Sequence, residues 1–301
     1  MVGASSQSHI VPDSDVSFSA YYDVLGVPVH VSANDPEAFA RVNETYAAFQ
    51  QRQTAVPVFR AWLVRSAKGV EVSDTRGYAQ LWPDIAAATI DLLDRMVHGV
   101  LAAFYARGIY AIHAGACVYR GAAVLIAGRS GQGKTTLVLG LLRKGFGLLS
   151  DEFAVAEPGA QRLLPYQRSI HIRPGTPELI PELAWVAERP QVRLGGGIEW
   201  TLTTSDLTHS FPGCLAEAAP LRHVLLLEGA PQPAAEPSIE PVAGAVAAMA
   251  LVRGTWAASQ DFAAGLARIA SLLDDVRCAR LRVGALDATT ARIAGWLEAQ
   301  P

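Results

Sequence analysis

The most informative segment of the chain is Gly128-Arg-Ser-Gly-Gln-Gly-Lys134-Thr135-Thr136, which fits the pattern G-x-x-x-x-G-K-[ST]. Because polyphosphates are anionic, a loop that binds them must direct several backbone N–H groups to one point, and glycine permits the turns and the close approach. In this pattern the lysine reaches the β- and γ-phosphates and the threonine hydroxyl binds Mg²⁺. We therefore predict a phosphate-binding loop that uses Gly128, Ser130, Gly131, Gln132, Gly133, Lys134, Thr135 and Thr136.

The sequence on either side of this segment supports the prediction. A continuous apolar run at 124–127 is typical of a strand buried on both faces, and a helical pattern at 134–144 ends at Gly145. A phosphate loop needs this order of strand, loop and helix, because the N-terminus of the helix adds partial positive charge. The alternative is a glycine-rich turn with an incidental lysine.

An acidic pair, Asp151 and Glu152, follows the next apolar run at 146–149. If that run is a strand of a parallel sheet, the pair lies at the same edge as the phosphate loop. An acidic side chain there can bind Mg²⁺ or accept a proton from an attacking hydroxyl. A turn or helix-cap aspartate is the alternative.

A histidine, His113, comes just before two predicted strands at 114–119 and 122–127. Its imidazole could orient an acidic residue or contact phosphate. Taken alone, the residue is more typical of a core histidine whose ring is satisfied by the backbone.

Composition excludes several classes of protein. Half of the 301 residues are apolar, 18% are charged and the net charge is −3, which indicates a globular chain and gives no sign of nucleic acid or an anionic membrane as a partner. The three cysteines are far apart and lack metal-ligand spacing, as is typical of free thiols in a reducing compartment. No signal peptide and no apolar run of membrane-spanning length is present, so we expect a soluble cytoplasmic protein.

The pattern of apolar and turn residues predicts four regions. They are a disordered, Ser-rich segment at 1–17, an α+β region at 18–107, a core with the phosphate loop at 108–229, and a C-terminal helical region at 230–301 that packs on the core. The main expected helices span 35–53, 84–107, 242–258, 261–275 and 287–299. The further expected strands span 59–64, 70–73, 169–172, 221–227 and 279–283. Residues 195–197 are expected to form a loop, and the Pro/Ala-rich stretch at 230–241 is expected to be a linker or a surface excursion.

Three segments together resemble a known family. They are HAG at 113–115, VLIAGRSGQGKTT at 124–136 and GFGLLSDE at 145–152. In order and spacing they resemble the catalytic core of HPr kinase/phosphorylase, and more closely the HPr-kinase-related proteins of bacterial peptide-tailoring clusters, some of which resemble serine kinases of lasso precursor peptides. The resemblance covers roughly residues 108–175, and the flanks at 1–107 and 176–301 are similar only in outline.

This resemblance implies ATP with Mg²⁺ and phosphoryl transfer to a serine hydroxyl. The first acidic residue of the family's pair is the proton acceptor, which maps to Asp151, and the second lies next to the histidine, which maps to Glu152 and His113. HPr kinase usually has Asp-Asp at this place, whereas the related proteins often have Glu at the second position, as this chain does. Thr135 and Asp151 are the implied metal ligands.

The family also has a basic residue in a Pro-Arg-Pro-Ile-type segment, which matches PYQRSIHIR at 165–173. Arg168 and Arg173 are therefore candidates for neutralising charge at the γ-phosphate, with surface arginines as the alternative. HPr kinase has a Glu-x-Arg motif here, and His171 stands at the position of its glutamate. The elements that bind HPr are not recognisable, so HPr itself is a poor candidate for the substrate.

The resulting expectation is an α/β protein with a P-loop sheet core of the phosphoenolpyruvate-carboxykinase and HPr kinase type and an N-terminal α+β region. We expect an ATP-dependent kinase with His113, Lys134, Asp151, Glu152, Arg168 and Arg173 in its active site, acting on a serine of a ribosomally made peptide or small protein. A small-molecule hydroxyl kinase and a non-catalytic, nucleotide-gated peptide-binding module stay open as alternatives. The sequence lacks the signatures of ABC ATPases and GTPases, and it leaves a homo-oligomer open.

Overall fold

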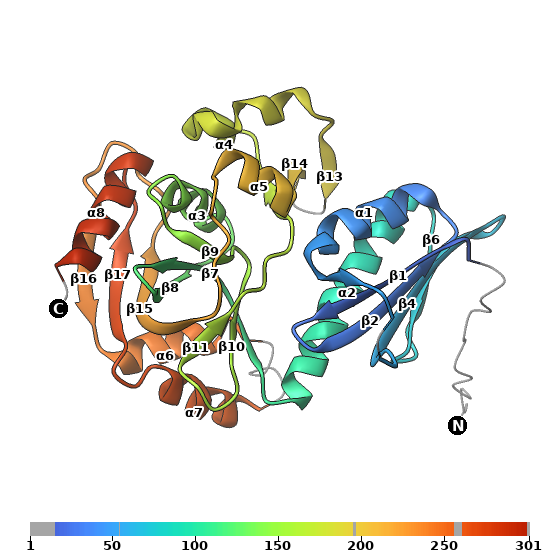
Figure 1. Cartoon of the computed structure of the whole chain (residues 1–301), viewed down its shortest axis with the longest axis horizontal. Helices are drawn as coiled ribbons and strands as arrows, with labels where there is room; N and C mark the ends of the chain where they lie inside the picture. Colours follow the sequence, from blue (N-terminus) through green and yellow to red (C-terminus); the bar gives the residue numbers. More distant parts are fainter. Residues whose placement is uncertain (1–15, 54, 195–196, 256–260, 300–301) are drawn as a thin grey trace. The chain divides into compact units, whose positions relative to one another are not determined.

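The computed structural model describes residues 16–53, 55–194, 197–255 and 261–299 and has the mixed α/β class expected from the sequence (Figure 1). The chain divides into two compact units, Met1–Ala106 with Arg193–Gly197 and Arg107–Val192 with Ile198–Pro301. The predicted disordered segment lies outside the described residues except for its last two positions. The predicted loop at 195–197 and the predicted helix at 242–258 also run partly outside them.

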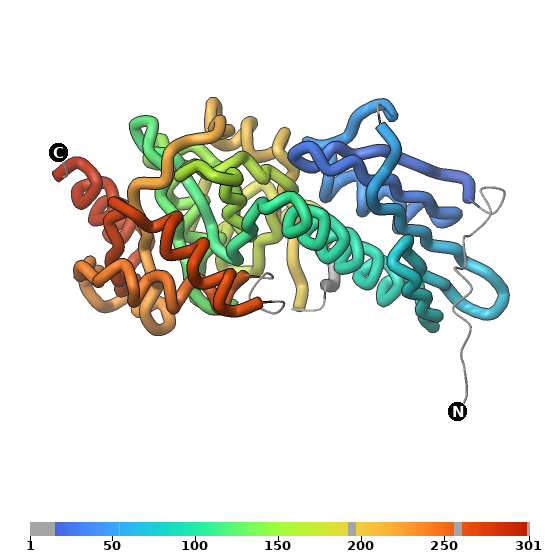
Figure 2. Tube along the Cα trace, turned by 90° about the horizontal axis from the view of Figure 1, so that it is seen from below, coloured from blue at the N-terminus to red at the C-terminus, as the bar shows by residue number. Residues whose placement is uncertain are grey.

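In the first unit, the described residues form a six-stranded sheet in the order β3-β1-β2-β4-β5-β6, and the helices α1 and α2 pack against it. The helix α2 is visible along its length in Figure 2, in teal. Gly99 of α2 is needed for close packing, because a Cβ there would come within 2.5 Å of the Phe59 ring. The elements are β1 (Phe18–Val24), β2 (Val27–Ala33), α1 (Pro36–Tyr46), β3 (Gln50–Gln51), β4 (Phe59–Ser66), β5 (Gly69–Asp74), β6 (Ala79–Trp82) and α2 (Ile85–Ala106).

The helix predicted at 35–53 begins as expected but is shorter. Asp35 caps α1, since its Oδ1 accepts hydrogen bonds from the backbone N–H groups of Glu37 and Ala38 at 3.0 and 3.1 Å. The helix ends at Tyr46, a 3₁₀ turn follows, and residues 50–51 pair with β1 as the short strand β3. The prediction was wrong at this end because a sheet partner distant in sequence, β1, takes the backbone hydrogen bonds that a longer helix would have used.

The second unit contains the phosphate-loop segment, and its described residues form an eight-stranded sheet. Its main path is β11-β10-β7-β8-β15-β17-β16, with β9 also paired to β7. The strands β8, β15 and β17 are parallel, so their carboxyl ends meet at one edge. These strands are β7 (Tyr110–Tyr119), β8 (Ala122–Ala127), β9 (Gly147–Ser150), β10 (Phe153–Ala156), β11 (Arg162–Leu164), β15 (Ala219–Glu228), β16 (Ser238–Val242) and β17 (Arg277–Arg282).

Helices cover both faces of this sheet. In Figure 1, α3 (Lys134–Leu142) and α8 (Leu286–Glu298) lie on one face, and α6 (Gly244–Val252) and α7 (Phe262–Leu272) lie on the other. Part of the predicted linker at 230–241 is instead the edge strand β16, which contains Pro241. A proline is tolerated at an edge because its missing N–H faces away from the ladder.

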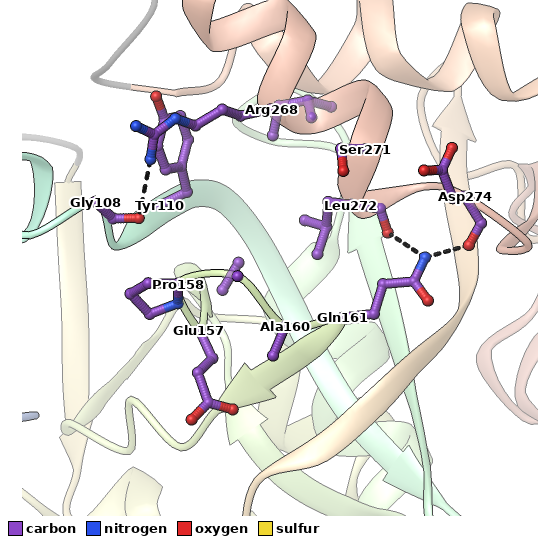
Figure 3. A pocket seen from close by; sticks show the side chains of 13 residues that line it. Gly108, Tyr110, Glu157, Pro158, Ala160, Gln161, Arg268, Ser271, Leu272 and Asp274 are labelled. Carbon is purple, nitrogen blue, oxygen red and sulfur yellow. Dashed lines mark hydrogen bonds between the residues drawn. The ribbon is translucent and has the colours of Figure 1, made fainter.

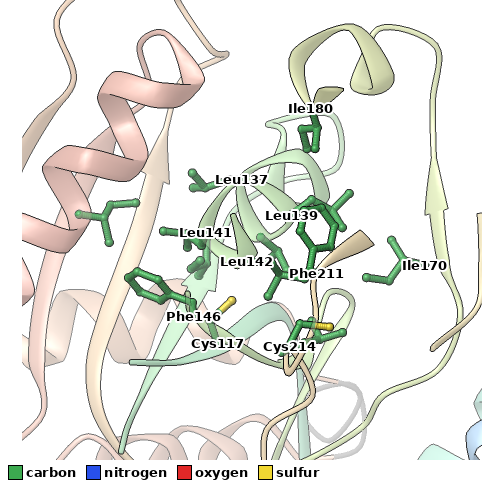
Figure 4. Packing of buried hydrophobic residues seen from close by; sticks show 14 of the residues in the cluster. Cys117, Leu137, Leu139, Leu141, Leu142, Phe146, Ile170, Ile180, Phe211 and Cys214 are labelled. Atoms are coloured by element: carbon green, nitrogen blue, oxygen red, sulfur yellow. The ribbon is translucent and has the colours of Figure 1, made fainter. Parts of the chain in front are cut away.

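The helix after the phosphate loop is buried on all sides. Leu137, Leu139, Leu141 and Leu142 of α3 are at most 4% exposed and pack with Phe146 and other apolar side chains of the sheet (Figure 4). A helix that is apolar around its whole circumference can only be stable inside a protein. This packing therefore fixes the position of the helix N-terminus and of the loop that precedes it.

A smaller group of elements adjoins the same helix. The strands β12 (Ile170–Ile172) and β14 (Gly197–Leu202) pair antiparallel, and the other elements here are α4 (Thr176–Leu179), η3 (Pro181–Glu188), β13 (Val192–Leu194) and α5 (Thr204–Ser210). A capping box between Thr203 and Asp206 begins α5. Among the described residues, no helix combines the length and the apolar character needed to cross a membrane.

Candidate active site

The phosphate-loop segment joins the end of β8 to the start of α3, in the order predicted from the sequence. Gly131 and Gly133 have φ angles of 82° and 81°, in the left-handed region that favours glycine. Gly133 is the N-cap of α3, so the first N–H groups of the helix lack partners within the helix and are directed toward the loop. This is the geometry of an anion site at a helix N-terminus.

Lys134 lies in the loop with its charge held by backbone carbonyls. Its Nζ donates to the carbonyl oxygens of Gly128 at 2.8 Å and Arg129 at 3.2 Å, and the residue is only 8% exposed. Burial lowers the pKa of Lys134, and the negative charges of Asp151 and Glu152 oppose that shift. An anion in the loop would give this ammonium group a charged partner that the carbonyls do not supply.

The first half of the loop is tied to the neighbouring strand by Gln132. Its side-chain oxygen accepts a hydrogen bond from the backbone N–H of Arg129, and its Nε2 donates to the carbonyl of Gly229 at 2.9 Å. The same side chain leaves no room beside Gly128, where a Cβ would lie 2.7 Å from the Gln132 Oε1 and 2.9 Å from the Leu227 Cβ. Gly128 is thus required by close packing and not by its backbone angles.

The acidic pair lies at a break between two strands that share one partner. Both β9, which ends at Ser150, and β10, which begins at Phe153, pair antiparallel with β7. Asp151 and Glu152 therefore fall beside the middle of β7, and the Ala114 N–H donates to the Glu152 carbonyl at 3.0 Å.

The pairing of β9 differs from the prediction, although the acidic pair still lies at the expected edge of the sheet. The sequence predicted that the strand before Asp151 belongs to a parallel ladder, but β9 pairs antiparallel with β7. Because β7 is also antiparallel to β8, the strands β9 and β8 point the same way. The acidic pair consequently lies at the edge where β8 leads into the phosphate loop.

Asp151 is in hydrogen-bond contact with the loop. The Thr135 hydroxyl donates to its Oδ2 at 3.3 Å. Burial, and next the negative charge of Glu152, raise the pKa of Asp151 to about 7, although Arg168 and the Thr135 hydrogen bond act in the opposite direction.

These two oxygen-bearing groups fit the ligand preference of Mg²⁺, which is commonly bound by one or two protein groups together with substrate phosphates. No group of three or more His, Cys, Asp or Glu side chains suited to a metal ion occurs within the described residues. A cation held by Thr135 and Asp151 would complete its shell with waters and substrate phosphate oxygens.

Two arginines enter the same cavity, each paired with a carboxylate. Arg168, which is 9% exposed, donates through Nη2 to Glu152. Arg173 donates through Nε to Glu199 Oε1 at 3.0 Å, and its side chain is 53% exposed. Both arginines can therefore neutralise charge in the cavity without being buried as isolated ions.

Glu199 is a member of the site that the sequence reasoning missed. It is only 8% exposed and lies on β14, which pairs with β12 so that Trp200 is opposite Ile172 and Thr201 is opposite His171. This pairing brings Glu199 to Arg173 across 26 positions of sequence. In the sequence, Glu199 is a single acidic residue in an apolar, strand-like stretch after the predicted loop. Nothing in that stretch indicates which residue it pairs with.

His113 lies inside β7 and not ahead of it. It is paired with Phe153 in the ladder, and its ring makes an edge contact with the Phe153 ring at 5.7 Å. Burial and then the charge of Lys134 lower the pKa of His113, with Glu152 acting in the opposite direction and Arg168 in the same one. These effects favour the neutral form of the imidazole.

The structure brings all six predicted catalytic side chains into one cavity of about 520 Å³. Ser130, Gly131, Gly133, Thr135 and Thr136 of the loop line it too, whereas Gly128 and Gln132 line a neighbouring hollow. The predicted catalytic residues in this cavity are His113, Lys134, Asp151, Glu152, Arg168 and Arg173, and further lining residues include Ser169, His171, Thr176, Leu179 and Glu199.

Another cavity, between the β10–β11 turn and α7, is built differently (Figure 3). Arg268 donates to the Gly108 carbonyl at 3.3 Å and stacks over the Tyr110 ring, while Gln161 donates to the carbonyls of Leu272 and Asp274. These contacts connect α7 to the sheet, so we interpret this cavity as a structural feature.

Comparison with known proteins identifies no family for this chain. No protein-family model matches the sequence, and no curated protein matches it. Among solved structures, the Hpr(Ser) kinase/phosphatase from Coxiella burnetii is similar at 14% identity and a TM-score of 0.29, over 62% of this chain and 96% of that chain.

Proposed function

We propose that this chain is an ATP-dependent kinase with an HPr-kinase-like P-loop core, which transfers the γ-phosphoryl group to the hydroxyl of a serine in a peptide or small protein. The observation that carries the proposal is the 3.3 Å contact between the Thr135 hydroxyl of the loop and the Asp151 carboxylate, within a cavity that also contains Lys134 and two arginines. Phosphoryl transfer needs these parts: an anion cradle, a cation site, a base and positive charge.

The loop and its lysine would bind the nucleotide. Backbone N–H groups at the start of α3 would donate hydrogen bonds to the phosphate oxygens, and Lys134 would exchange the carbonyls of Gly128 and Arg129 for the β- and γ-phosphates. Thr135 and Asp151 would hold Mg²⁺, which supplies positive charge against the phosphates.

Asp151 would accept the proton of the acceptor hydroxyl. The hydroxyl oxygen forms a bond to the γ-phosphorus, the bond from that phosphorus to the β,γ-bridging oxygen breaks, and its electron pair leaves with ADP. The proton passes to the Asp151 carboxylate. Arg168 and Arg173, each already held by a glutamate, would offset the charge on the transferred group.

Glu152 and His113 would act as positioning residues. Glu152 binds the Arg168 guanidinium and, through its backbone carbonyl, the middle of β7. His113 lies on β7 opposite Phe153, one residue from the acidic pair in the ladder. Both contacts keep the acidic pair and Arg168 in one arrangement, which is what catalysis by positioning requires.

The test is mass spectrometry of peptides and small proteins encoded beside the gene, after incubation with the protein, Mg²⁺ and γ-labelled ATP. We expect a phosphoserine product with the wild type and with the exposed control variant Asp275→Asn, and none with Asp151→Asn, which should still bind ATP. Full transfer by Asp151→Asn would show that the base is wrongly assigned. ATP binding without transfer to any of these acceptors would leave a small-molecule hydroxyl kinase or the nucleotide-gated binding module as the better function.

A further inference from the structure

A second hollow borders the phosphate loop on its β15 side. It has a volume of about 660 Å³ and lies at the carboxyl ends of β8 and β15, against α6. Gly128, Arg129 and Gln132 of the loop line it, and so does His113, which also lines the active-site cavity. The phosphate loop and His113 thus lie between the two hollows.

Three arginines give this hollow a strong positive charge, and we call it the arginine groove. They are Arg129 of the loop, Arg253 at the end of α6 and Arg280 of β17. All three are exposed, and none forms an ion pair with any of the described residues. The acidic residue in the lining, Glu228, is already paired with Arg282 at 3.4 Å.

The charge of the groove contrasts with the rest of the molecule. The chain as a whole has a net charge of −3, and both arginines in the active-site cavity are bound by carboxylates. Neighbouring like charges that form no ion pair cost free energy in the free protein, and that cost is offset when an anionic ligand binds. Glu240, which lies opposite Arg280 in the β16–β17 ladder, reduces the cost for that one arginine.

The same groove has an apolar wall. Val246, which is 42% exposed, and Ala250 and Leu251 of α6 line it, together with the last apolar residues of β15. A wall of this kind with charges at its rim is suited to an extended peptide, whose backbone and apolar side chains lie on the wall while its charged side chains reach the rim.

The position of the groove suits the second substrate. The active-site cavity, at about 520 Å³, is of the size that one nucleotide-like ligand fills, so an acceptor needs room next to it. His113 connects the two: its backbone N–H donates to the Gly254 carbonyl at 2.8 Å, next to Arg253, and the residue lines both hollows.

We propose that the arginine groove binds the acceptor as a peptide segment in which Asp or Glu residues flank the acceptor hydroxyl. The carboxylates would pair with Arg129, Arg253 and Arg280, and the hydroxyl would enter the active-site cavity past His113. This inference rests on the proposed kinase function and adds to it a substrate class, an acidic peptide.

The experiment compares two short fluorescein-labelled peptides that differ only in charge. Each has one central serine, flanked either by Asp and Glu or by Asn and Gln. Binding is measured by fluorescence anisotropy, without nucleotide and with Mg²⁺ and a non-hydrolysable ATP analogue. We expect the acidic peptide to bind the wild type about tenfold more tightly than the neutral one, and the difference to shrink as salt is added.

The variants separate the groove from general surface charge. Arg253→Gln with Arg280→Gln should remove most of the preference for the acidic peptide. Arg222→Gln with Arg292→Gln, which makes the same change of charge at two other exposed positions, should retain it. Equal binding of both peptides to the wild type, or an equal loss of preference in both double variants, would overturn the inference.

The measurements also distinguish failure of the kinase proposal from failure of the acidic-peptide proposal. Binding of a fluorescent ATP analogue is measured for every variant, so loss of the nucleotide site is distinguished from loss of the groove. If no ATP binds the wild type, the proposed function fails, while peptide binding without nucleotide still tests the groove. If ATP binds but the acidic peptide has no advantage, the kinase proposal stands and the acceptor class is wrong.

Discussion

The Thr135 hydroxyl lies 3.3 Å from Oδ2 of Asp151, although the two residues are 16 positions apart in the sequence. One belongs to the first turn of a buried helix, and the other lies at a break between two strands that share a partner. Because both supporting elements are packed into the sheet, this pair of oxygen-bearing side chains is held in place before any ligand binds. Preformed geometry of this kind reduces the cost of ordering a site when substrate arrives.

Replacing Lys134 by Ala is expected to weaken ATP binding by about tenfold to a hundredfold, since a hydrogen bond from a charged group contributes roughly 1.5–3 kcal/mol. Isothermal titration calorimetry with Mg²⁺·ATP measures the change. Lys144→Ala is the matched control, because Lys144 is an exposed residue just after α3. An equal loss in both variants would place the nucleotide elsewhere.

Gly128→Ala is expected to destabilise the fold by about 1–3 kcal/mol and to weaken nucleotide binding, because the new Cβ would displace Gln132 and Leu227 from contacts under 3 Å. Gly295→Ala in α8 is the control, because a Cβ there meets no other atom within 4 Å. That control should gain a little stability from helix propensity. Thermal unfolding of both variants, followed by titration with ATP, tests the prediction, which fails if both variants behave like the wild type.

The raised pKa of Asp151 predicts a cost in stability at high pH. With a folded-state pKa of about 7, the folded protein retains a proton that the unfolded chain loses near its ordinary value, so stability decreases as pH rises through that window. Asp151→Asn cannot ionise, and in the presence of a chelator it should melt higher than the wild type above pH 7, with the difference shrinking toward pH 4. A difference in melting temperature that does not change with pH would contradict the assigned shift.

The lowered pKa of His223 predicts the opposite dependence of stability on pH, a loss of stability at low pH. Burial, and next the charges of Arg277 and Arg222, lower the pKa of His223 to about 4. The unfolded chain therefore takes up a proton near pH 6.5 that the folded protein does not, and stability falls as the pH decreases from there to about 4. His223→Gln should flatten the stability profile in this window. The exposed His98→Gln is the control and should keep the wild-type slope.

Several parts of the site were readable from the sequence because each depends on a short stretch of chain. The strand, loop and helix around Lys134 follow from glycine spacing and apolar runs, and the structure has them at the predicted places. The position of Asp151 was inferred from the strand that precedes it. That inference holds for the direction of β9 even though its hydrogen-bonding partner is antiparallel and not parallel.

The other features were decided by tertiary structure. The early end of α1 depends on pairing between β3 and β1, the place of Glu199 beside Arg173 depends on pairing between β12 and β14, and the arginine groove combines residues of the loop, α6 and β17. Local periodicity determines where the chain is helical or extended, because it reflects which face of a short segment is buried. It does not determine which distant segments exchange backbone hydrogen bonds, and in this protein those long-range pairings select the charged side chains that meet in each cavity.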